Sequence, residues 1–256
     1  MPLKLNQIGD ATIQEDIARN RERLEKFLAA PPSSPMRSDP VRYSRRLSDA
    51  AVELGLELYQ QEGEVSEIRR CLALAGKELF ALLSIDREAA ALSPLEFEKA
   101  SALAVCFCPP SVYENADKIP IGKFFADPQA LAFYAVLARY LDVLRNFLTS
   151  GKLHQEAWGT VEAECLRSNA ARYDAQVNLA KLRALKAVSE GDGGNLNAAI
   201  ATLIEDHENE ARRGENQRST RGFVCLPALM LAHLGAARNL ACTIESPYLP
   251  LQLPGR

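Results

Sequence analysis

The sequence predicts an all-α protein, and three observations support this prediction. Apolar residues recur at intervals of three and four along most of the chain, as on the buried face of a helix. Stretches rich in proline, glycine and serine separate these segments, as at residues 31–40 and 189–195. Alternation typical of a strand is limited to a short candidate around Thr243 and Ile244. We therefore expect a single domain over residues 1–256, with about eight or nine antiparallel helices around hydrophobic central helices.

The most apolar stretch lies within residues 221–250, where nearly every residue between Phe223 and Leu234 is apolar. Pro227 stands where it would open a helix, and Arg238 and Asn239 end the run with polar character. A helix that is apolar on all sides needs other elements around it. We expect the rest of the chain to form a shell around this helix.

The N-terminal half begins with an amphipathic pattern over residues 11–30, and residues 31–40 (PPSSPMRSDP) form a Pro- and Ser-rich linker after this first helix. Apolar residues then repeat at helical spacing over 47–58 and again over 65–82, with Gly63 between the two runs. Two helices joined by a short turn predict a helical hairpin.

Capping signals and apolar stripes define the later helices. Residues 93–96 (SPLE) match a capping box and predict a helix to about Phe107. Asp127 and Pro128 predict another helix start, followed by two parallel apolar stripes over 131–148, so this helix is expected to be buried on two faces. Residues 152–188 are helical in composition with a break near Ser168, and a helix from Leu196 is expected to end before Gly214.

Composition and charge restrict the classes of function. The 256 residues carry a net charge of −3 and are 47% hydrophobic, so the chain lacks the basic footprint of nucleic-acid binders, and direct nucleic-acid binding is not expected. No apolar run approaches the roughly 18 residues that a membrane helix needs, and the N-terminal sequence lacks the apolar core of a signal peptide. We expect a cytoplasmic protein whose six cysteines stay reduced as small core residues.

Candidate chemical sites have weak patterns. His207 has acidic neighbours but shares an apolar helical stripe, and no second histidine follows four residues later, so we interpret it as structural and not as a metal ligand. Cys106 and Cys108 lack the two-residue spacer of metal or redox pairs. The glycines of residues 191–194 lack the lysine of a phosphate loop. We therefore predict no catalytic residue, cofactor or metal.

Two acidic groups are candidates for binding a basic partner. Most such groups are solvated helix faces, but opposite charge also speeds the encounter of two proteins. The first group is near the C-terminus and the second is in the first predicted helix: Glu205, Asp206, Glu208 and Glu210, and Glu15, Asp16, Glu22 and Glu25.

The order and spacing of three C-terminal segments give the sequence a resemblance to a known family. These segments are residues 204–207 (IEDH), 223–235 (FVCLPALMLAHLG) and 244–250 (IESPYLP). Together they resemble the Immunity protein 49 family of bacterial polymorphic toxin systems. The sequence departs from the family pattern at Pro247, where an acidic residue is expected, and at residues 236–239 (AARN), which replace a more polar turn.

This resemblance implies a non-catalytic protein that binds a cognate secreted toxin and blocks it in the producing cell. A nuclease toxin would have a basic cleft that an acidic patch could occupy. The residues also leave open a helical scaffold for another partner and an all-α metal-dependent enzyme acting through His207. The oligomeric state is not predicted.

Overall fold

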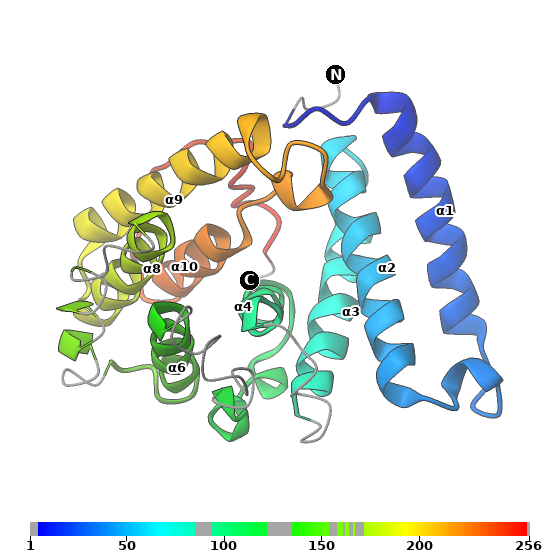
Figure 1. Cartoon of the computed structure of the whole chain (residues 1–256), viewed down its shortest axis with the longest axis horizontal. Coiled ribbons are helices and arrows are strands. Elements are labelled where there is room, and N and C mark those ends of the chain that lie inside the picture. Colours follow the sequence, from blue (N-terminus) through cyan, green and yellow to red (C-terminus); the bar gives the residue numbers. More distant parts are fainter. Residues whose placement is uncertain are drawn as a thin grey trace.

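The computed structural model describes residues 5–84, 94–121, 135–153, 158–160, 162–163, 166 and 172–254, and all regular secondary structure in these ranges is helical. The all-α prediction is confirmed. The α-helices, labelled as in Figure 1, are α1 (Asp10–Ala29), α2 (Pro40–Gln60), α3 (Val65–Leu83), α4 (Pro94–Phe107), α6 (Ala135–Ser150), α8 (Arg172–Glu190), α9 (Gly193–Arg213) and α10 (Leu226–Ala236). Short 3-10 helices are η1 (Pro35–Arg37), η3 (Pro110–Val112), η4 (Ala116–Lys118) and η6 (Thr220–Gly222).

The helices form two groups with α4 between them. Helices α1, α2 and α3 lie side by side at the right of Figure 1, and α6, α8, α9 and α10 lie at its left. Helix α4 contacts α3 on one side and α10 and α6 on the other. It therefore joins the two groups.

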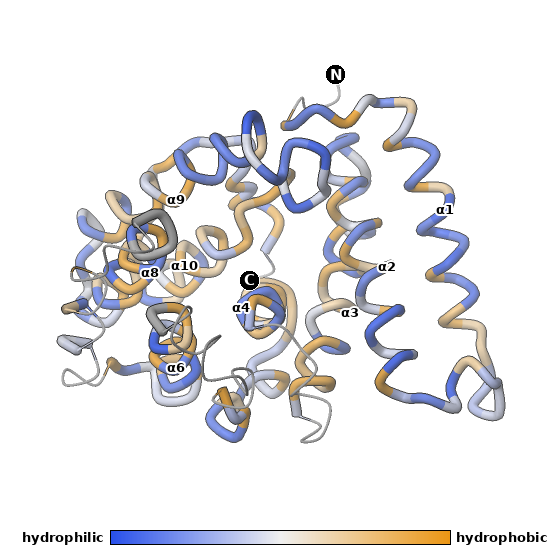
Figure 2. The backbone as a smooth tube through the Cα atoms, viewed as in Figure 1, coloured by the Kyte–Doolittle hydropathy of each residue, from blue (hydrophilic) through white to orange (hydrophobic). Residues whose placement is uncertain are grey.

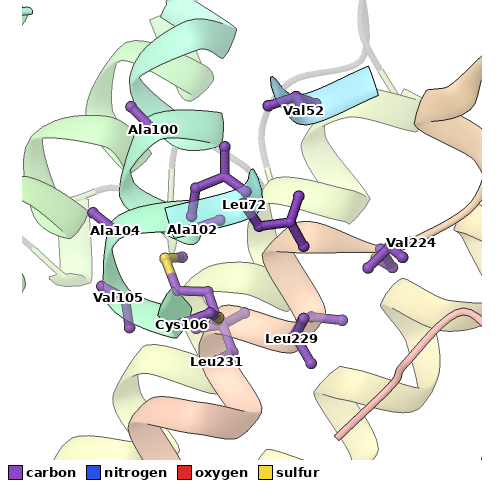
Figure 3. Close-up of a cluster of buried hydrophobic side chains, with 14 of the residues drawn as sticks. Val52, Leu72, Ala100, Ala102, Ala104, Val105, Cys106, Val224, Leu229 and Leu231 are labelled. Carbon is purple, nitrogen blue, oxygen red and sulfur yellow. The ribbon is translucent and has the colours of Figure 1, made fainter. Parts of the chain in front are cut away.

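Helix α4 is enclosed along most of its length. Every residue from Phe97 to Cys106 except Lys99 is buried. Figure 3 shows small side chains of α4, among them Ala100, Ala102 and Ala104, in the same cluster as Leu229 and Leu231 of α10. Because small side chains let helices approach closely, this run of α4 can pack against neighbours on several sides.

Helix α10 begins at Leu226, one residue before Pro227, which was expected to open it. The backbone N–H of Cys225 donates to the carbonyl of Tyr248 at 2.9 Å, which holds the residues before the helix against the C-terminal segment. Helices α4, α8 and α9 pack against α10, so the predicted shell is present in part. His233 and Leu234 stay partly exposed, so the helix is not buried on every side.

The predicted hairpin corresponds to α2 and α3, and Gly63 lies in the turn between them. The connection between α1 and α2 contains η1, and the Asp39 side chain accepts from the backbone N–H of Arg42 at 3.0 Å to cap α2. Pro40 is the first residue of α2, so the helix starts one residue earlier than a linker over 31–40 implies. Proline at this position needs no N–H partner.

The structure tests some of the predictions made for the helices after residue 93. Apart from the partly exposed Leu148, the described residues of both stripes of α6 are buried: Leu137, Tyr140, Leu141, Val143, Leu144 and Phe147. Gly191 takes a φ of 75°, which favours glycine, and Asp192 caps α9 by accepting from the N–H of Asn195 at 2.9 Å. Helix α9 begins at Gly193, three residues before the expected Leu196, and ends at Arg213, as expected. Ser93, the Asp127-Pro128 start and the break near Ser168 lie outside the described residues.

The C-terminal segment, residues 240–254, lies across both groups of helices. The N–H of Thr243 donates to the Asn197 side chain of α9 at 2.7 Å, and the Tyr59 hydroxyl of α2 donates to the carbonyl of Pro247. Arg69 of α3 donates through Nε to the carbonyl of Leu253 at 2.7 Å. The candidate strand at Thr243 and Ile244 is not formed in this described segment. Its backbone hydrogen-bonds to side chains of α9, α2 and α3, and not to a neighbouring strand.

Helix α1 packs through an apolar stripe of Ile13, Ile17, Leu24 and Phe27, although Figure 2 shows the helix as predominantly hydrophilic, and polar contacts add to this packing. The buried amide Nδ2 of Asn20 donates to both carboxyl oxygens of the buried Glu57 of α2, at 3.0 and 3.1 Å. Arg21 pairs with Glu67 of α3 at 3.1 Å. Burial raises the pKa of Glu57 to about 7, against an opposing hydrogen bond from Asn20.

This raised pKa predicts a pH-dependent stability. Unfolded Glu57 loses its proton near its ordinary pKa of 4.5, whereas the folded carboxyl keeps it until about pH 7, so its contribution is full below pH 4.5 and lost as pH rises through 7. Glu57→Gln cannot ionise, and should therefore unfold at a higher temperature than the wild type at pH 8 and at a similar one at pH 5. Thermal unfolding at both pH values measures this, with the exposed Glu25→Gln as control. Equal shifts at both pH values would contradict the prediction.

Candidate interaction surface

The acidic residues of α9 are close in sequence but differ in their environments. Glu205 is exposed, and Asp206 is partly exposed. Glu208 pairs with Arg212 at 2.8 Å, and Glu210 turns back to accept from the N–H of Glu215 at 2.9 Å. The helix carries four acidic and two basic residues, so this end keeps a negative excess, with Glu205 as its most accessible member.

The acidic residues of α1 are balanced by neighbouring bases. Asp16 pairs with Arg19, and Glu22 pairs with Lys26 at 2.6 Å, while Glu15 and Glu25 are exposed. The sequence of α1 contains five acidic and four basic residues, so its net charge is −1. Exposed pairs of this kind contribute little to stability, but they reduce the field that a distant partner senses. Helix α1 is therefore the weaker of the two predicted acidic surfaces.

His207 lies where three parts of the chain meet. Its ring forms an edge contact with the ring of Tyr248, with 5.4 Å between the centroids. Burial lowers its pKa to about 4, and a hydrogen bond with the backbone of Gly222 opposes this shift. The Tyr248 hydroxyl donates to the carbonyl of Leu5 at 2.7 Å. His207 thus packs as a neutral side chain that helps hold both ends of the described chain on α9.

The remaining chemical candidates also have structural environments. Among the described residues, no His, Cys, Asp and Glu side chains form a group that could hold a metal. Burial raises the pKa of the Cys71 thiol to about 11 and of Cys225 to about 12, which disfavours the reactive thiolate. Cys71, Cys106 and Cys225 are buried, as expected of core residues, whereas Cys108 and Cys242 are partly exposed and lie outside helices. His154 and Cys165 lie outside the described residues.

A groove of about 680 Å³ lies along α8 and α9. The buried Trp158 and the 66% exposed Leu166 line it from the segment before α8. Its charged residues occur in opposite pairs, with Arg183 beside Glu162 at 3.8 Å and Lys186 beside Glu190 at 4.0 Å. Its other lining residues are mainly small or uncharged: Gln176, Leu179, Ala180, Ala187, Asn195, Ala198, Ala199 and Thr202.

A buried ion pair lies at the junction of α4 and α8. The Lys181 ammonium contacts the two carboxyl oxygens of Glu98 at 2.7 and 2.9 Å, and each side chain is only 8% exposed. The ammonium also lies 5.2 Å from the ring centroid of Tyr140 of α6. Burial, followed by the nearby Glu98, raises the pKa of the Tyr140 hydroxyl well above its usual range, so this hydroxyl stays protonated. These three side chains connect three helices inside the protein.

The comparisons with known proteins identify the family. The model of the family Immunity protein 49 matches residues 102–253, more than half of the chain. The chain belongs to the Immunity protein 49 family. A search of curated proteins and a search of solved structures found no match. Within the described residues, no helix is both long enough and apolar enough to cross a membrane.

Residues shared with the Immunity protein 49 pattern make contacts that close the fold. Tyr248 touches His207, its hydroxyl donates to Leu5, and its carbonyl accepts from Cys225 at 2.9 Å. The matched region begins within α4, so α1, α2 and α3 lie outside it. The residues that carry the resemblance are therefore structural ones.

Sequence analysis did not find the groove or the buried pair. Glu98 and Lys181 are 83 residues apart, and neither has a distinctive neighbour in the sequence. A charged residue among the apolar residues of α4 was the one available signal, because buried charges are normally paired. The family name, by contrast, agrees with the resemblance found from the sequence.

Proposed function

We propose that this protein binds a cognate secreted toxin in the cytoplasm and neutralises it by stoichiometric association, without catalysis. Membership of the Immunity protein 49 family carries this proposal. Three described features agree with it: a helical body, thiols disfavoured from ionising and an acidic surface near the end of α9. Such a body presents a fixed surface, which limits the ordering that binding requires.

A nuclease is the class of toxin that the acidic end of α9 fits best. The cleft of a nuclease is basic because it holds phosphates, and carboxylates can occupy it in place of the nucleic acid. Glu205 is the exposed acid of this surface, whereas Glu208 and Glu210 have partners within the protein. We accordingly rank the α9 surface above α1 as the first contact with the toxin.

Co-expression with the product of the neighbouring gene tests the function. Cells that express the toxin alone should die, and cells that also express this protein should grow and yield a stable complex of the two proteins. The control is a strain that expresses the toxin with an unrelated helical protein. Survival of cells without the protein, or death in its presence with no complex formed, would refute the proposal.

Charge reversal at Glu205 should slow association with that toxin. Glu205→Lys removes the exposed negative charge and is expected to reduce the association rate about tenfold at low salt and to weaken its salt dependence. Stopped-flow measurements at two ionic strengths test this result. Glu25→Lys on α1 is the matched control and should have little effect, because α1 has nearly balanced charge. Association rates unchanged in both variants would exclude steering by either surface.

A further inference from the structure

The groove between α8 and α9 has the form of a docking site. The two helices pack against each other, and alanines on both of them, including Ala180, Ala187 and Ala199, leave space beside Trp158. The resulting hollow of about 680 Å³ lies in the size range of sites that hold ligands. Leu166, 66% exposed at its edge, is the most exposed of the large hydrophobic side chains among the described residues. An apolar occupant would remove this side chain from water.

The charges around the groove indicate which charge a bound segment would carry. Arg183 and Lys186 are each close to an acidic residue that also lines the groove, so the charges of the described lining residues cancel. Ala198 and Thr202 line it from α9, and residues three and four apart share one face of a helix, so the same face continues to Glu205. The groove therefore leads from a floor of mixed polarity, in which alanine and leucine side chains lie beside paired charges and Lys186 lies over the Trp158 ring, to the acidic end of α9.

We propose that this groove receives a segment of the toxin that presents apolar side chains followed by a basic residue. The apolar side chains would fill the hollow beside Trp158 and Leu166, and the basic residue would lie against Glu205. This mode corresponds to the docking of an amphipathic segment into a groove. The inference rests on the proposed function, since the toxin is the partner, and it assigns that partner a place on the surface.

Two exposed helical alanines provide a matched test. Ala198 of α9 lines the groove, whereas Ala81 of α3 lies in the other helix group. Ala198→Tyr should fill the groove and weaken toxin binding at least tenfold, whereas Ala81→Tyr should leave the dissociation constant unchanged. The probe is the toxin whose lethality this protein cancels in co-expression, titrated against each purified full-length variant. Thermal unfolding of both variants verifies that each is folded.

Trp158 gives a second and independent measurement, because it is the one tryptophan in the sequence and it lines the groove. Protein labelled with 5-fluorotryptophan should show a shifted fluorine resonance when unlabelled toxin binds. The shift should be lost in Ala198→Tyr at toxin concentrations that saturate the wild type and should persist in Ala81→Tyr. A complex that leaves this resonance unchanged would place the toxin elsewhere.

The outcomes separate the two proposals. Equal affinities of the two tyrosine variants, with a wild-type complex present, would overturn the groove and leave the proposed function intact. Failure of the wild type to form any complex with the toxin would overturn the function itself. A fluorine shift caused by a small molecule carried through purification, and absent after dialysis, would identify a different occupant and also overturn docking of the toxin.

Discussion

Replacing Lys181 by methionine should lower the free energy of unfolding by about 3–5 kcal/mol, because it leaves the buried carboxylate of Glu98 without a partner. The methionine side chain keeps most of the volume of lysine, so loss of the ion pair dominates over loss of packing. Urea denaturation at pH 7 measures the change. This is one of the two largest effects that we expect from a single substitution.

The double variant Glu98→Met with Lys181→Met tests this explanation. Replacing both charges by apolar groups removes the unpaired charge, and buried pairs replaced in this way often lose little stability. The double variant should therefore be more stable than Lys181→Met alone, with a large coupling energy in the double-mutant cycle. Additive losses would mean that the two side chains contribute independently.

Gly76→Ala should also destabilise the protein, by about 1–3 kcal/mol, even though alanine favours helices. A Cβ at Gly76 of α3 would lie 3.0 Å from the backbone N of Ala104 and from the backbone carbon of Leu103 in α4. Backbone atoms cannot move aside as a flexible side chain does, so α3 and α4 would have to separate. Urea denaturation compares the variant with the wild type.

Gly193→Ala is the control for this substitution. Gly193 also lies in a helix, but a Cβ there would meet no atom within 4 Å. The same substitution should therefore leave stability unchanged or raise it by a few tenths of a kcal/mol through helix propensity. A loss of stability at Gly193 equal to that at Gly76 would contradict the assignment of the effect to helix packing.

Helix positions could be predicted where one face of the helix is polar. The stripes of α2, α3 and α9 alternate with charged residues, and their predicted ends lie close to the observed ones. The central place of α4 was not predicted, because a helix buried on most sides has no polar face to reveal its neighbours. The start of α10 was predicted from Pro227 to within one residue, because proline is favoured in the first turn of a helix.

In the candidate surface too, some features could be predicted from residue spacing and others could not. Residue spacing alone allows the pairs Glu22 with Lys26 and Glu208 with Arg212, since residues four apart are neighbours on a helix. The groove arises from alanines on two helices, and alanine is common enough that its positions predict no cavity before the helices are packed. Identification of the family depended on three segments whose order is visible in the sequence.

The crossing of residues 240–254 over both helix groups has a consequence for synthesis. Contacts such as Tyr248 with Leu5 and Arg69 with Leu253 join residues that leave the ribosome far apart in time. Contacts between distant parts of a chain slow folding, because the intervening loop must close first. Helix α4 already joins the two groups, but the contacts of residues 240–254 across both groups can form only after translation has passed Leu253. Under the proposed function, a newly made molecule would bind toxin in its finished form only after this delay.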